Sequence, residues 1–221
     1  MTRRNIIRLF ESRRGRLDYR AKRDYVRNGI ASIPCRISRF SDVISTYSVR
    51  GFETLNPEFV DYVRTTAEVT PQEYPLVLNI IGGGLSEEEK NTIRRITVDD
   101  FSYDLGIVEK DEHRHTRTFL LMFLGLILSG LLLWMTHALA EEPREVFFIL
   151  FWFMGDYLCD YIFLTGYEFR RERVLAGRLA SIRVEFSETY EDQDYSEKYV
   201  ETLYSEIEKD VKQTIREDET C

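Results

Sequence analysis

Two long apolar runs in the second half of the chain dominate its hydropathy pattern. The first, TFLLMFLGLILSGLLLWMTHALA, covers residues 118–140, and the second, VFFILFWFMGDYLCDYIFLTGY, covers residues 146–167. About 20 helical residues, at a rise of about 1.5 Å each, cross a hydrocarbon layer about 30 Å thick. A soluble helix normally keeps a polar face, whereas residues 118–136 include no charged side chain. The pattern therefore predicts a two-span transmembrane helical hairpin over residues 118–167.

Basic residues at the two flanks of the hairpin predict its orientation. The connecting turn, residues 141–145, holds three glutamates and one arginine. Lys and Arg near the ends of a span stay on the cytoplasmic side. We therefore expect a multi-pass protein of the cell (cytoplasmic) membrane with both termini cytoplasmic. The basic flanking residues are Lys110, Arg114 and Arg117 before the first span, and Arg170, Arg171, Arg173 and Arg178 after the second.

The segments before the hairpin carry short strand and helix signals. Residues 33–37 and 43–49 are short stretches typical of β-strands. Asn56 followed by Pro57 is a common helix start, because Asn caps the first free amides and Pro fits the first helical position. The helix that begins there should end before Pro71.

A strand followed by a helix is predicted next. The run YPLVLNII, residues 74–81, is continuously apolar and only eight residues long, which favours a buried strand. Ser86 and Glu89 have the spacing of a capping box, which predicts a helix over residues 87–104. Its candidate buried positions are Ile93, Ile96 and Phe101.

After the hairpin, the pattern predicts a basic helix, a strand and a final helix. Residues 181–186 alternate apolar and charged positions, as in a half-buried strand that pairs with residues 74–81. Such a pairing would join both flanks into one small cytosolic α+β domain. Residues 193–216 place an apolar residue at every fourth position. This stripe can dock on the same domain or on a protein partner.

The soluble flanks differ strongly in charge, although the net charge of the chain is −8. Residues 1–40 form a basic arm, residues 41–117 an α+β segment, and residues 168–221 a helix–strand–helix with an acidic tail. The arm favours contact with anionic lipid over nucleic acid, since it has no nucleic-acid-binding motif. A solvated arm is the alternative. Its candidate membrane-surface residues are Arg3, Arg4, Arg8, Arg13 and Arg14.

Two aspartates in the second apolar run are the main candidates for function. Asp156 and Asp160 lie one helical turn apart, and each charged Asp near the centre of a span costs about 2.5–3.5 kcal/mol. Counting inward from both cytoplasmic ends places Asp156 opposite Ser129 and Asp160 opposite Gly125. We therefore expect the carboxylates to pack on this small-residue face. In a homo-oligomer they could instead form rings that attract cations.

No catalytic set, metal site or cofactor motif is recognisable in the soluble segments. The chain has three widely spaced cysteines, Cys35, Cys159 and Cys221, which support neither a disulfide framework nor a zinc site. No Ser/His/Asp or Cys/His arrangement suggests hydrolysis. We expect a membrane-anchored interaction or assembly protein. A small oligomeric cation channel or pore-type effector is the alternative, and a membrane-bound enzyme comes third.

Four segments of the chain are similar to a known group of proteins. YPLVLNI, LSEEEKNTIRR and TFLLMFLGLIL, followed by EFRRERVLAGRL after the second span, resemble uncharacterised bacterial two-span membrane proteins with cytosolic flanking segments. The resemblance covers roughly residues 40 to 186, so it leaves out the basic arm and the acidic tail. It implies a bacterial cytoplasmic membrane and brings no known activity.

Overall fold

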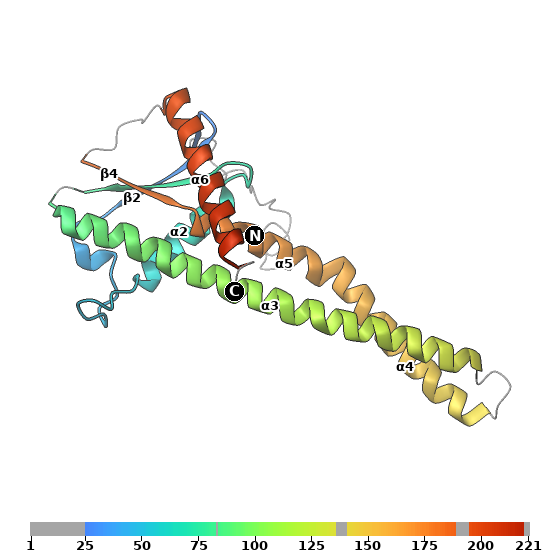
Figure 1. Cartoon of the computed structure of the whole chain (residues 1–221). Coiled ribbons are helices and arrows are strands. Elements are labelled where there is room, and N and C mark those ends of the chain that lie inside the picture. Colours follow the sequence, from blue (N-terminus) through green and yellow to red (C-terminus); the bar gives the residue numbers. More distant parts are fainter. Residues whose placement is uncertain (1–24, 83, 136–140, 189–194, 219–221) are drawn as a thin grey trace, which may run out of the picture.

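The computed structural model describes residues 25–82, 84–135, 141–188 and 195–218. It consists of a head, built from a small sheet and helices, and a long helical hairpin that projects from the head (Figure 1). In chain order, the elements are β1 (Val26–Arg27), β2 (Ile30–Arg36), η3 (Phe40–Asp42), α2 (Pro57–Val69), β3 (Leu76–Ile81), α3 (Glu87–Met135), α4 (Glu141–Asp160), η5 (Tyr161–Thr165), α5 (Gly166–Ala180), β4 (Arg183–Ser187) and α6 (Glu197–Asp218).

The sheet joins segments from both sides of the hairpin. Its strand order is β1-β2-β3-β4, in which β2, β3 and β4 are parallel and β1 is antiparallel to β2. Leu78 of β3 lies beside Ile33 of β2 and beside Val184 of β4. The pairing predicted between residues 74–81 and 181–186 is thus confirmed. Parallel neighbours need crossover connections, so the head has the β–α–β connectivity of α/β domains, not the predicted α+β arrangement.

The hairpin is part of the crossover between β3 and β4. After β3, α3 runs 49 residues as one helix, about 74 Å long at 1.5 Å per residue. α4, η5 and α5 then return to β4 as one helical column, in which η5 is a π-helical turn. The sequence predicts a separate first helix over residues 87–104. The structure shows no break there, because residues 105–117 contain no proline and a single glycine, Gly106.

The core of the head lies on both faces of the sheet. On one face, α2, α3 and α5 pack against Ala31, Ile33, Leu76, Leu78 and Ile80, all of which are buried. The predicted buried positions of α3 are confirmed, since Ile93, Ile96 and Phe101 are at most 3% exposed. On the other face, α6 packs Leu203 against Ile30 and Val77. The sheet is therefore covered by helices on both sides.

Local capping signals in the sequence are reproduced, and one strand signal is not. The Asn56 side chain accepts a hydrogen bond from the amide of Glu58 at 3.0 Å, and α2 ends at Val69, before Pro71. The amide of Ser86 donates to Glu89 Oε2 at 2.8 Å, and the amide of Glu89 donates to Ser86 Oγ at 3.3 Å.

The strand predicted over residues 43–49 is wrong. Residues of this segment form two isolated bridges, Ile44 to Leu55 and Val49 to Phe52, because the loop folds back on itself and meets no neighbouring strand. Conversely, β2 occupies residues 30–36, which the charge pattern groups with the basic arm. Its apolar residues Ile30, Ala31 and Ile33 are fully buried, so burial determines the role of this segment.

A half-buried arginine links the end of α5 to the loop after α2. The guanidinium of Arg178 donates to the carbonyl oxygens of Ala67, Pro71 and Tyr74 and to Thr70 Oγ1, at 2.9–3.4 Å. The last carbonyls of a helix have no partner within the helix and carry partial negative charge. Thr70 already donates to the carbonyl of Ala67 from its hydroxyl at 2.8 Å, so Arg178 adds a charged donor there and fixes the loop that leads into β3.

Gly82 lies close to the backbone of Ile37, which allows a matched test of packing. A methyl group at Gly82 would lie 2.6 Å from the carbonyl oxygen of Ile37, which cannot move without the chain. We expect Gly82→Ala to destabilise the head by about 2 kcal/mol, as overpacking does. Gly177, in α5, has open space around it, so Gly177→Ala should be neutral or stabilising by up to about 1 kcal/mol. Thermal unfolding in detergent measures both, and equal melting temperatures would contradict the expectation.

Candidate functional site

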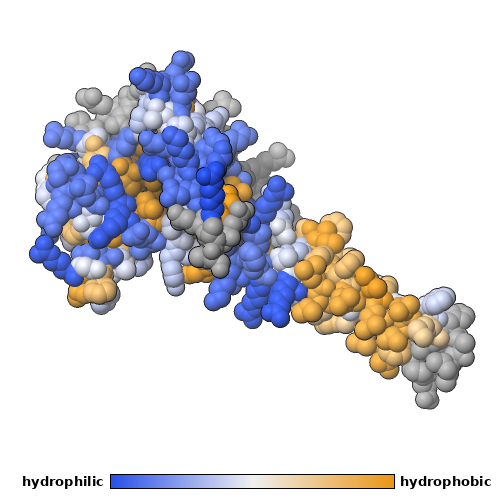
Figure 2. All heavy atoms as spheres, in the orientation of Figure 1, coloured by the Kyte–Doolittle hydropathy of each residue, from blue (hydrophilic) through white to orange (hydrophobic). Residues whose placement is uncertain are grey.

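The hairpin carries an extensive exposed apolar surface. In Figure 2 the hairpin is hydrophobic over its distal part, and a hydrophilic section separates this part from the head. α3 and the α4–α5 column each contain an apolar window long enough to cross a membrane, of which only 6% is buried. Trp134, Trp152 and Phe163 are 70–76% exposed. A core helix of a soluble protein would be mostly buried, and neither window lies near the N-terminus, where a signal sequence would be.

The register of the hairpin differs from the one expected from hydropathy. The rings of Phe119 and Tyr161 lie 4.7 Å apart, and a methyl group at Gly125 would lie 2.6 Å from Met154 Sδ. Gly125 therefore faces Met154, where the count from the span ends predicted Asp160. The prediction used hydropathy boundaries as depth markers. Side-chain packing between the helices sets the register instead.

The two aspartates lie on the back of the second helix column. Asp156 and Asp160 are both exposed, and each lies two residues after a packed position, Met154 or Leu158. Helix positions two residues apart differ by about 200° in direction, so both carboxylates point away from α3. The predicted contact between the carboxylates and the face of Gly125 and Ser129 is wrong within one chain.

Their depth also differs from the sequence estimate. Asp160 precedes Tyr161, whose hydroxyl lies 3.5 Å from Thr116 Oγ1, so Asp160 lies at the head-proximal end of the apolar segment. Asp156 lies one turn, about 6 Å, further along. Ser129 is 4% exposed, and its hydroxyl donates to the carbonyl of Leu126 at 3.0 Å. The structure thus separates Ser129 from the aspartates.

Basic residues surround the hydrophilic section between the head and the apolar surface. Arg170 and Arg171 are exposed on α5. Arg173 differs from them, because it forms ion pairs with Glu112 at 3.0 Å and Glu109 at 3.4 Å on α3. Arg173 therefore holds α3 and α5 together, and its charge is partly neutralised. The predicted arm residues Arg3, Arg4, Arg8, Arg13 and Arg14 lie outside the described residues.

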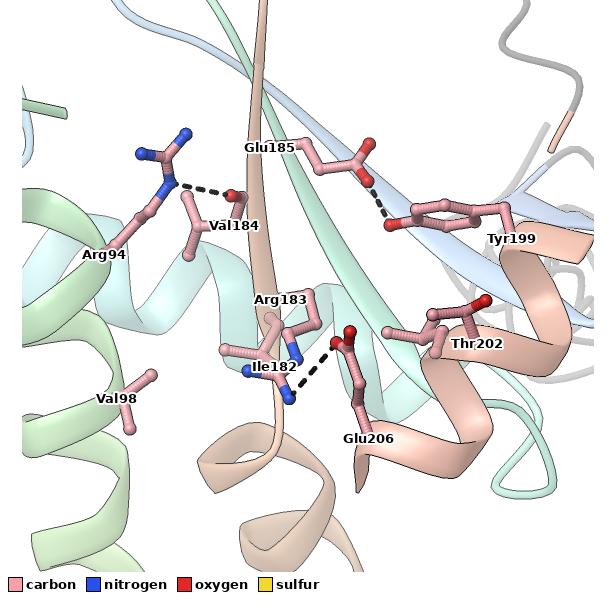
Figure 3. Close-up of a pocket in the computed structure, with 10 residues that line it drawn as sticks. Arg94, Val98, Ile182, Arg183, Val184, Glu185, Tyr199, Thr202 and Glu206 are labelled. Carbon is pink, nitrogen blue, oxygen red and sulfur yellow. Dashed lines mark hydrogen bonds and ion pairs between the residues drawn. The ribbon is translucent and has the colours of Figure 1, made fainter. Parts of the chain in front are cut away.

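A groove of about 320 Å³ lies beside β4, between α3 and α6 (Figure 3). The outer strand β4 forms its base, Arg94 and Val98 come from α3, and Tyr199 and Glu206 come from α6. Figure 3 shows that side chains from all three elements border this space. The alternation of residues 181–186 predicted the strand, but no local signal in the sequence indicates that α3 and α6 leave a groove there.

Charged groups around the groove are arranged asymmetrically. Arg183 Nη2 lies 2.6 Å from Asp210 and 3.7 Å from Glu206, so Arg183 ties β4 to α6. Its Nε is buried and has no hydrogen-bond partner among the described residues. Arg94 donates to the carbonyl of Val184 at 3.4 Å, and its guanidinium carbon lies 5.0 Å from the centroid of the Phe186 ring. Among the described residues, no carboxylate forms an ion pair with Arg94.

Tyr199 and Glu185 form a polar contact beside the groove. The Tyr199 hydroxyl donates to Glu185 Oε1, and its ring stacks on Tyr195 with centroids 5.4 Å apart. Burial, together with this hydrogen bond and the charge of Glu185, raises the pKa of Tyr199 well above its ordinary value of 10. The neutral hydroxyl is thus favoured in the folded state.

The raised pKa of Tyr199 predicts alkaline instability. In the unfolded chain Tyr199 ionises at its ordinary pKa, whereas the folded state keeps the proton. Its contribution to stability is therefore complete below pH 10 and decreases as the pH rises above 10. We expect Tyr199→Phe to cost about 1 kcal/mol at pH 7 and to reduce the loss of stability above pH 10. Denaturant unfolding at pH 7 to 11 measures this, and equal alkaline slopes would contradict it.

The final helix docks mainly within the chain. Leu203 is 3% exposed, and Tyr199 and Ile207 are partly buried against the same cluster. Val211 and Ile215, further along the predicted stripe, are 46% and 53% exposed. The part of the helix near β4 therefore has its partner in the sheet. No group of three or more His, Cys, Asp or Glu residues is placed to hold a metal ion within the described residues.

No family model matches the chain, and no curated protein or solved structure is significantly similar to it.

Proposed function

We propose that the chain is a membrane-anchored interaction or assembly protein, with a cytosolic α/β head carried on a two-span hairpin. The observation that supports this most is the continuity of α3. The helix packs under the sheet at Ile93, Ile96 and Phe101 and then continues into the exposed apolar surface. An apolar surface of this extent is stable in hydrocarbon and unstable in water.

The hairpin would hold the head away from the bilayer surface. Phe101 is the last buried residue of α3 before the apolar segment, which begins at residue 118. The intervening helix is about 24 Å long, and Arg173 braces it against α5. The basic flanks favour the cytoplasm as the location of both termini. Such a stiff connection suits a module that presents a surface to partners at a fixed height.

A chain in which Trp152→Cys supplies the only cysteine tests the membrane location. Trp152 is 70% exposed on α4 and lies about two helical turns deeper in the proposed span than Asp160. In membranes we expect a charged, water-soluble thiol reagent to leave this cysteine unmodified, since the reagent does not enter hydrocarbon. Denaturation in detergent should restore the reaction. A matched chain whose only cysteine comes from Tyr103→Cys, at a position that is 72% exposed, should react in permeabilised membranes. Equal reaction of the two single cysteines in permeabilised membranes would refute the proposal.

A small oligomeric cation channel is the second candidate. It is favoured by the exposure of Asp156 and Asp160 on the back of the hairpin, where a neighbouring protomer could cover them. A homo-oligomer with a closed ring would place these carboxylates near a pore. Flux through liposomes tests the idea. We expect Asp156→Asn with Asp160→Asn to reduce cation flux strongly, and absent or unchanged flux would exclude conduction.

A further inference from the structure

The edge of β4 that faces away from β3 is the feature from which a partner surface can be derived. Among the described residues, β4 is an edge strand of the sheet and no strand pairs with this edge. The carbonyl of Ser187 accepts a hydrogen bond from the amide of Gly82 at 3.1 Å, so Ser187 directs its backbone groups toward β3. Backbone groups of successive residues in a strand point to opposite sides, so those of alternate residues point to the same side. Val184 and Phe186 therefore direct their amide and carbonyl groups outward.

The contact of Arg94 with the strand supports this assignment. Its Nε donates to the carbonyl of Val184, which is possible only if that carbonyl points away from β3. At 3.4 Å the hydrogen bond is long, so an incoming amide can replace it at low cost. An exposed row of such groups pairs readily with another extended chain.

We propose that the groove beside β4 binds an extended, acidic and apolar peptide of a partner protein, which adds to the sheet as its fifth strand. The inference deepens the proposed interaction role, because it specifies the kind of partner. β-strand addition obtains affinity from backbone hydrogen bonds and selectivity from pockets for alternate side chains. A groove of about 320 Å³ accommodates a few residues of such a strand, not a whole second domain.

The chemistry of the lining determines the composition of the peptide. Val98, Ile182 and Leu203 line the groove and favour apolar side chains. Arg94 forms no ion pair among the described residues. Its Nη1 donates to Asn91 Oδ1 at 2.9 Å, and its Nε would be released from Val184 by the incoming strand. A carboxylate on the peptide can then pair with Arg94. Glu206 is paired with Arg183 and Glu185 accepts from Tyr199, so Arg94 is the lining charge that remains for the peptide, and a mixed acidic and apolar strand fits better than a basic one.

Selection from random seven-residue peptides displayed on phage tests the proposal with the full-length chain in detergent. We expect selected peptides to alternate apolar residues with Asp or Glu and to protect the amides of Val184 and Phe186 from hydrogen exchange. A synthetic copy of a selected peptide, N-methylated at the backbone amides that face β4, should bind at least about tenfold more weakly than a copy N-methylated at the backbone amides that point away from β4. Selection without this alternation, or equal binding of the two methylated copies, would overturn the proposal.

Variants of the protein provide the second half of the test. Arg94→Glu should weaken binding of the acidic peptide about tenfold and strengthen binding of the same peptide with Lys in place of its Asp or Glu residues. A loss of folding cannot produce such a reversal. Arg171→Glu, on the exposed side of α5, is the matched control and should leave binding unchanged. If Arg94→Glu and wild type select the same peptides, the assignment is wrong. Peptide binding in detergent does not depend on membrane insertion, so its failure is distinct from failure of the membrane anchor.

Discussion

Aspartates at positions 124 and 128 are expected to abolish membrane integration of the chain. Leu124 and Leu128 are 63% and 56% exposed on the outer side of α3, so neither substitution disturbs the packing against α4. Each aspartate near the middle of a span costs about 2.5–3.5 kcal/mol, and two cost about 5–7 kcal/mol. We expect the double variant to disappear from the carbonate-resistant membrane pellet, in which wild type should remain.

The same substitution elsewhere on α3 is the control. Tyr103 and Ile107 are 72% and 44% exposed on the section between the head and the apolar segment. If hydrocarbon begins near residue 118, Tyr103→Asp with Ile107→Asp exchanges two water-exposed side chains for polar ones and should leave the chain in the pellet. Loss of both double variants from the pellet would indicate general misfolding. Retention of both would show that no bilayer surrounds Leu124 and Leu128.

Most patterns that lie within one segment were predicted correctly from the sequence, although the strand expected over residues 43–49 was not. The cap at Asn56 and the capping box at Ser86 depend on side chains within three residues of the helix start, and both are present. The alternation of residues 181–186 and the apolar run of residues 74–81 predicted two strands, and their pairing is confirmed. Burial of Phe101 followed from helical periodicity.

Apart from the pairing of residues 74–81 with 181–186, features that depend on packing between distant segments were not predicted. Asp156 was expected to face α3, because the span ends served as depth markers for both helices. In the structure, contacts such as that of Phe119 with Tyr161 fix the register. The partner of each residue lies several residues away from the one that the count gave. The groove beside β4 likewise requires Arg94 and Tyr199 to meet across 105 positions of the chain. No local pattern encodes such a meeting.

The parallel sheet joins segments that the sequence pattern assigned to separate parts of the chain. β2, from the segment grouped with the basic arm, and β4, from beyond the hairpin, flank β3 in one sheet. Charge composition separates these segments, whereas hydrogen bonds and burial join them. The head is therefore completed only when the chain has returned through α5. The stability of the head should therefore depend on the contact between α5 and α2, where Arg178 lies.

Replacement of Arg178 by methionine is expected to destabilise the head by about 3 kcal/mol. Methionine keeps most of the apolar volume but removes the charged donors to the carbonyls of Pro71 and Tyr74, whereas the carbonyl of Ala67 keeps its hydrogen bonds from Thr70. Hydrogen bonds from a charged group are worth about 1.5–3 kcal/mol each, and acceptors left without a partner add a desolvation cost. The loop into β3 and the end of α2 should then open to protease. Limited proteolysis and thermal unfolding in detergent measure the effect.

Arg171→Met is the matched control, because Arg171 lies on the same face of α5 two turns earlier and is exposed. It should change stability by less than about 0.5 kcal/mol. Arg178→Met should also leave the chain in the membrane pellet, since the apolar surface of the hairpin is unchanged. Loss of head stability without loss of membrane integration would show that the hairpin inserts without a complete sheet. If both variants unfolded at the wild-type temperature, Arg178 would not be what holds α5 against α2.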